Sequence, residues 1–109
     1  MKLTDRDIRL VRDIALSHVL SRDQMIELGY FTSVSRCNRT LARLKTSGLV
    51  TTLTTPFFGQ RLSVAGSKAK EVVGEKIARL LAFRQPTPRF LQHSLAVTEV
   101  RVALLKQGG

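Results

Sequence analysis

The N-terminal part of the chain has apolar residues at helical spacing. Thr4 and Asp7 stand in the positions of a capping box, in which each side chain bonds the backbone N–H of the other residue. The next apolar positions recur every three or four residues and therefore share one face: Ile8, Val11, Ile14 and Ala15. This pattern predicts an amphipathic helix that starts after Thr4.

A second helix-start signal comes after a short extended link at residues 18–20. Ser21 and Gln24 repeat the capping-box spacing, and Gly29 is typical of the left-handed residue that ends a helix. The spacing between these signals predicts a brief second helix.

The third helix is predicted to begin at Thr32 or Ser33 and to end at Ser47, before Gly48. We expect one apolar face of this helix to pack in the core, formed by Val34, Cys37, Leu41 and Leu44. Two β-rich segments come next, at residues 50–55 and 61–64, and the turn-forming residues between them predict a hairpin.

The C-terminal part predicts two more helices. The first covers residues 67–83, where Gly74 weakens the helix modestly, and Pro86 interrupts the helical pattern after it. Thr87 and Pro88 suit the cap and the first position of a last helix that extends close to the C-terminus.

The last predicted helix is apolar around much of its circumference, which requires more burial than one small domain offers. We therefore expect either a homodimer interface on this helix or a chain cut from a longer protein. The residues assigned to the dimer interface are Leu91, Leu95, Val102 and Leu105.

Together these elements predict a mainly α fold with a small β-hairpin, arranged as a winged helix-turn-helix plus a C-terminal helix. A chain of 109 residues suits one hydrophobic core. We place a winged-helix domain at residues 1–84. Residues 85–109 form the C-terminal helix, as a dimerisation element or the start of a further domain.

The chain is strongly basic, and its charge is unevenly distributed. Eighteen Lys and Arg against eight Asp and Glu give a formal net charge of +10. No acidic residue occurs between Glu27 and Glu71. A solvated surface usually mixes both signs, so this acid-free block favours a positive face for a polyanionic partner. Charge alone does not separate nucleic acid from an anionic membrane or an acidic protein.

The outward face of the third predicted helix is the strongest candidate site. A turn of 100° per residue places three arginines and a serine opposite the apolar face. These side chains bond base edges or phosphates, and a helix followed by a hairpin is the arrangement that enters the major groove of double-stranded DNA. The predicted DNA-binding residues are Ser33, Ser35, Arg36, Asn38, Arg39, Thr40, Arg43, Gln60, Arg61 and Lys68.

Little in the sequence points to catalysis or to a cofactor. Cys37 lies on an apolar face, so we expect it to pack in the core. His18 and His93 have no second ligand at metal-binding spacing, and no paired-carboxylate or Ser-His-Asp pattern is present. We expect a protein without enzymatic activity, metal or cofactor, and with no evident small-molecule ligand. The single cysteine and the absence of a long apolar run favour a cytoplasmic protein outside the membrane.

Several segments resemble those of winged-helix regulators: LTDRD at residues 3–7, LSRDQ at 20–24, RTLARL at 39–44 and GLV at 48–50. Together with QHSLAVTEVR at residues 92–101, they make almost the whole chain similar to the N-terminal half of replication-relaxation proteins of plasmids and other mobile elements. The resemblance implies DNA binding in plasmid replication or gene control. It also implies a second domain that usually continues the chain in such proteins.

Two other functions compete with DNA binding. Winged helices also serve as docking modules, in which the arginines would meet an acidic protein and Phe57 and Phe58 would anchor the contact. A nuclease or relaxase is the other alternative, for which the sequence lacks a metal-binding acid cluster.

Overall fold

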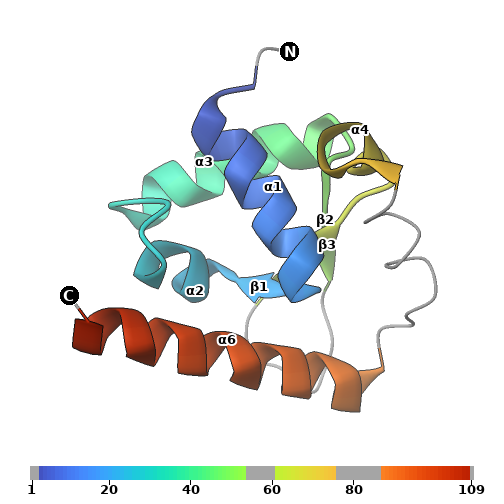
Figure 1. The fold of residues 1–109 in the computed structure, drawn as a ribbon. Coiled ribbons are helices and arrows are strands. Elements are labelled where there is room, and N and C mark those ends of the chain that lie inside the picture. Colours follow the sequence, from blue (N-terminus) through green and yellow to red (C-terminus); the bar gives the residue numbers. More distant parts are fainter. Residues whose placement is uncertain (1–2, 54–60, 76–86, 109) are drawn as a thin grey trace.

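The computed structural model describes residues 3–53, 61–75 and 87–108, which form helices around a small sheet (Figure 1). In chain order the elements are α1 (Asp5–Ser17), β1 (Leu20–Ser21), α2 (Arg22–Glu27), α3 (Val34–Thr46), β2 (Val50–Leu53), β3 (Leu62–Ala65), α4 (Lys70–Val73) and α6 (Pro88–Gly108). The predicted order of helix, short strand, helix, helix and hairpin is confirmed, as is the mainly α fold class.

The starts of α1, α2 and α6 agree with the capping signals in the sequence. The Asp7 N–H donates to Thr4 Oγ1 at 3.1 Å, and the Thr4 N–H donates to Asp7 Oδ2 at 3.2 Å. Ser21 and Gln24 make the same reciprocal pair, with both distances 3.2 Å. Thr87 Oγ1 accepts a backbone N–H from the first turn of α6 at 3.1 Å. These side chains satisfy N–H groups that have no partner inside the helix, and the predicted starts are confirmed.

The main core lies where α1, α2 and α3 meet the sheet. Its apolar members with no exposed surface are Leu10, Val11, Ile14, Ala15, Leu20, Met25, Cys37 and Leu44. Full burial of a side chain of Leu or Ile size contributes about 1.5–3 kcal/mol, so these residues hold the three helices against the sheet. The prediction that Val34 belongs to this core is wrong. Val34 is 44% exposed because it is the first residue of α3 and lies beyond the packed part of the helix.

The sheet is antiparallel, with strand order β1-β3-β2. In the central strand, Ser63 pairs with Leu20 of β1 on one side and with Thr52 of β2 on the other. The predicted hairpin strands are therefore confirmed, and the extended link before α2 supplies the third strand. The tip of the hairpin, including Gln60 and the two phenylalanines predicted as an anchor, lies outside the described residues.

Two glycines let the chain return from β3 to the end of α3. Gly48 has φ +82, and its carbonyl accepts the Lys68 N–H at 3.0 Å. A Cβ at Gly66 would lie 2.3 Å from the Gly48 carbonyl oxygen, so only glycine permits this approach. The side chain of Lys68 is consequently held beside the C-terminal end of α3.

The prediction of one continuous helix over residues 67–83 is wrong. Helix α4 ends at Val73, and Gly74 comes next with φ +89, a backbone conformation that an α-helix does not contain. Residues 76–86 lie outside the described part of the chain.

Helix α6 lies along α2 and β1 and joins the fold through apolar and polar contacts (Figure 1). Leu91 packs with Val19 and Leu62 in a second apolar cluster. The buried amide of Gln24 donates to a backbone carbonyl of α6 at 3.1 Å and to Glu99 Oε1 at 2.9 Å. Because Gln24 also completes the α2 capping box, one side chain links α2 to α6.

Asp13 makes a second link between α6 and the rest of the fold. Both carboxylate oxygens accept hydrogen bonds of 2.7 Å from Arg101, and Tyr30 and Ser17 donate at 2.6 and 2.9 Å. Burial acts to raise the pKa of Asp13, but these donors stabilise the charged form and hold the pKa below its usual value. Burial and the same carboxylate raise the pKa of Tyr30 to about 12.

Candidate nucleic-acid interface

The face of α3 that points away from the core carries polar and basic side chains. Its exposed residues include four of the predicted contacts: Ser35, Arg36, Asn38 and Arg39. Ser33 starts the helix, and its Oγ accepts the Arg36 N–H at 3.2 Å. No acidic residue occurs in α3, so the exposed arginines have no carboxylate partner within their own helix.

Two other predicted contact residues of α3 make their described contacts toward α1. Arg43 Nη2 donates to Asp7 Oδ2 at 2.7 Å, and the side chain of Asp7 has no exposed surface. Thr40 is buried and accepts a hydrogen bond from Arg6 at 3.5 Å. The Arg6 guanidinium also lies over the Phe31 ring, 5.0 Å from its centroid, in a cation–π contact. These interactions hold α3 against α1.

The predicted contacts outside α3 are more dispersed. Arg61 is exposed immediately before β3, and Lys68 is exposed beside the end of α3. Gln60 lies outside the described residues. The structure therefore places one basic group before the central strand and another beside the C-terminal end of α3.

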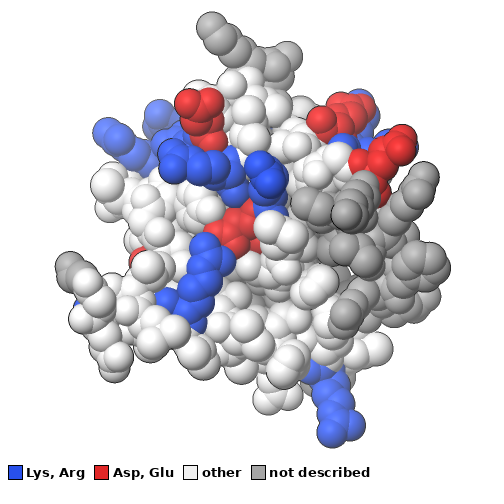
Figure 2. All heavy atoms as spheres, in the orientation of Figure 1, with Lys and Arg blue, Asp and Glu red and all other residues white. Residues whose placement is uncertain are grey.

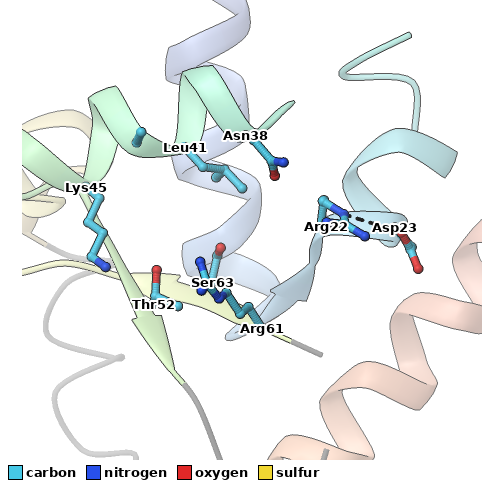
Figure 3. Close-up of a pocket in the computed structure, with 9 residues that line it drawn as sticks. Arg22, Asp23, Asn38, Leu41, Lys45, Thr52, Arg61 and Ser63 are labelled. Carbon is cyan, nitrogen blue, oxygen red and sulfur yellow. Dashed lines mark ion pairs between the residues drawn. The ribbon is translucent and has the colours of Figure 1, made fainter. Parts of the chain in front are cut away.

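A groove of about 710 Å³ separates α3 from the β2–β3 strands and reaches the start of α2 (Figure 3). Its lining comprises Arg22, Asp23, Asn38, Leu41, Ala42, Lys45, Thr52, Arg61 and Ser63. Three of these residues are basic and come from three different parts of the chain. The one acid, Asp23, lies 3.7 Å from the Nε of Arg22.

In this groove Asn38 and Arg61 lie together with two basic residues that were not predicted as contacts, Arg22 and Lys45. Arg22 has the appearance of an ordinary first helical residue, because it comes directly after the capping serine. Lys45 belongs to the acid-free block but not to the predicted arginine face. The signal for Lys45 is its distance of two helical turns from Asn38, which places both residues on the same side of α3.

The residues predicted for a dimer interface have different environments in the described chain. Leu91 and Val102 are each 2% exposed and pack inside the chain, while Leu95 is partly buried and Leu105 is exposed. A different set of apolar side chains on α6 points outward: Val97, Val100 and Leu104 are 56%, 60% and 63% exposed. In Figure 2 the surface over α6 is mostly free of charged side chains.

Other candidate chemistry is limited in the described residues. Cys37 is fully buried, as predicted, and burial raises the pKa of its thiol, which keeps the thiol protonated. Within residues 3–53, 61–75 and 87–108, no group of three or more His, Cys, Asp or Glu is placed to hold a metal ion. Over the same ranges, no helix combines the length and apolar character needed to cross a membrane.

Helices α2 and α3 followed by the β2–β3 hairpin define a winged helix-turn-helix fold. The chain belongs to the replication-relaxation family, whose model matches residues 11–109. Its fold is similar to the crystal structure of NadR in complex with 4-hydroxyphenylacetate, with a TM-score of 0.56 and 20% sequence identity. This similarity covers 96% of the present chain and 70% of the NadR chain, and at that identity it concerns the fold alone. A comparison with curated proteins gave no match.

Proposed function

We propose that this protein binds double-stranded DNA sequence-specifically, with α3 in the major groove. The observation that carries the proposal is the exposed, acid-free face of α3, which presents Ser35, Arg36 and Arg39. Arginine forms paired hydrogen bonds with guanine, and serine can bond a base edge. The major groove, about 12 Å wide, admits an α-helix.

The attachment of α3 to α1 supports the same proposal. The Arg43–Asp7 pair and the buried Thr40 fix the inner side of the helix, so its outer side chains are presented in a defined orientation. A binding surface that is ordered before contact loses less conformational entropy when the partner arrives. In this proposal Arg43 and Thr40 position α3, and the exposed residues make the contacts.

Basic residues beside α3 would contact the DNA backbone. We propose that Arg61, which is exposed immediately before β3, contacts the backbone of the flanking duplex. We propose that Lys68, which is exposed beside the C-terminal end of α3, contacts a phosphate there. Such contacts fix the position of a protein on the duplex without reading its sequence.

We further propose that the protein acts as a homodimer in transcriptional regulation or plasmid replication control. The outward apolar residues of α6 offer a surface for a second copy, and two copies would read half-sites roughly 34–36 Å apart. Membership of the replication-relaxation family supports a role in replication or gene control.

We propose binding rather than catalysis as the activity of the chain. Support comes from the single cysteine, Cys37, which is fully buried and whose thiol pKa is raised by burial, so it is not activated as a nucleophile. Incubation of purified protein with supercoiled plasmid and magnesium is expected to leave the plasmid intact. Nicking that copurifies with the protein would overturn this part of the proposal.

Selection of bound sequences from a random duplex pool tests DNA recognition directly. We expect an enriched motif with two symmetric half-sites. Arg39→Met should weaken the preference at one motif position by roughly 1–3 kcal/mol. Arg89→Met, a matched change at an exposed residue near the start of α6, should leave the motif intact. No duplex binding at low salt would refute the proposal and favour docking on an acidic protein.

A further inference from the structure

We infer that the groove between α3 and the β2–β3 strands holds one sugar–phosphate strand of the duplex, with Arg22, Lys45 and Arg61 as its phosphate contacts. The inference rests on the proposed function and adds a binding site to it. It assigns these three cations to the DNA backbone, separately from the exposed arginines of α3.

The first argument is the chemistry of the lining. Lys45 points from α3 toward the strands, and Arg61 comes from the opposite wall (Figure 3). The groove between them is lined by Asn38 and by the hydroxyls of Thr52 and Ser63. Ammonium, guanidinium, amide and hydroxyl groups are the side-chain donors that proteins use for phosphate oxygens.

The second argument is the charge balance. Among the lining residues, Arg22, Lys45 and Arg61 stand against the single carboxylate of Asp23, which lies closest to Arg22. In the described ranges neither Lys45 nor Arg61 has an acidic partner within 4.0 Å, and both are exposed. Their charges are therefore not used to hold the fold together, and an anion is the complementary occupant.

The third argument is the position of the groove relative to the duplex. One wall is α3, which the proposed function places in the major groove, and the other wall is the hairpin, which it places on the flank. In a duplex, a sugar–phosphate strand separates each major groove from the adjacent minor groove. A protein that contacts both sides of that strand must leave a channel for it, and the groove is the channel between these two elements.

The test is the salt dependence of duplex affinity for Lys45→Met and Arg61→Met, compared with wild type and Arg89→Met. Loss of one phosphate contact lowers the slope of log affinity against log salt by about 0.9. We expect the slope of each groove variant to be less steep than the wild-type slope by about that amount. Each variant should also bind the selected sequence and an unrelated duplex more weakly, by a similar factor. Arg89→Met should keep the wild-type slope. Unchanged thermal unfolding would show that the variants remain folded.

The outcomes separate this inference from the function on which it rests. Wild-type binding with unchanged slopes in both groove variants would overturn the groove assignment alone. Absence of duplex binding by the wild type would overturn both proposals. A titration with inorganic phosphate, followed through the backbone NMR signals of Thr52 and Ser63, tests whether the groove binds a DNA strand or a free anion. We expect weak phosphate binding that duplex DNA abolishes, and phosphate that stays bound beside the duplex would overturn the inference.

Discussion

Replacement of Arg43 by methionine removes a guanidinium from a buried carboxylate while keeping most of the side-chain length. Asp7 has no exposed surface, and Arg43 lies 2.7 Å from its Oδ2. Removal of one partner from a buried ion pair costs about 3–5 kcal/mol, because the remaining charge is left without compensation. Here the Arg43 side chain is 39% exposed, and Arg6 stays within 3.8 Å of Asp7 Oδ1. We therefore expect a smaller loss of about 2 kcal/mol, in the range of a charged hydrogen bond.

The assay is urea denaturation monitored by circular dichroism, with Arg39→Met as the matched control on the same helix. Arg39 is exposed, so its replacement should change the free energy of unfolding by less than about 0.5 kcal/mol. The Arg43 variant should also melt roughly 10 °C lower than wild type. Wild-type stability of Arg43→Met, combined with selective loss of DNA affinity, would refute the reasoning and return Arg43 to the contact surface.

Three further predictions concern Asp13, Tyr30 and α6. The pKa of Asp13 is lowered on folding, so its contribution to stability is present above its usual value of 3.8 and is lost as the pH falls through the folded pKa. Asp13→Asn should therefore flatten the fall in unfolding free energy on acidification, and an unchanged acid profile would contradict this. Tyr30 is the only tyrosine and the chain has no tryptophan, so tyrosinate absorbance reports it alone. Its midpoint should lie at about 12, and a midpoint at the usual 10.0 would contradict the contact with Asp13. In the proposed homodimer, Val100→Asp should reduce the sedimenting mass to that of one chain. The control is Leu16→Asp, at an exposed apolar residue of α1, which should leave the mass unchanged. Equal masses for the two variants would contradict a dimer through α6.

The local signals in the sequence were sufficient for most of the fold. Capping residues such as Thr4 and Ser21 mark helix starts through hydrogen bonds that span three residues, and such short-range interactions can be read directly from sequence. The same holds for Gly48 after α3, because the left-handed conformation favours glycine. Gly74 shows the limit: a glycine inside a helical pattern either weakens the helix or ends it, and the sequence does not decide between these outcomes.

Contacts between distant segments were much harder to predict. The arginines of α3 look equivalent on a helical projection, but only Arg43 meets a buried carboxylate, thirty-six positions away in sequence. Gln24 is recognisable as a capping residue, whereas its hydrogen bond to Glu99 depends on how α6 packs. Arg22 and Lys45 likewise become neighbours of one groove only through the tertiary fold. Helical periodicity gives the direction of a side chain around its helix axis but not the group that it meets there.

The division of α3 into an anchored side and an exposed side has a consequence for redesign. Ser33, Thr40 and Arg43 hold the helix through its cap and its contacts with α1, while Arg36 and Arg39 make no described ion pair with the rest of the chain. Substitutions at the two exposed arginines should therefore change stability little, as is usual for surface positions. A library that varies these positions and preserves the three anchors would keep the scaffold intact, so altered target preference could be selected separately from folding.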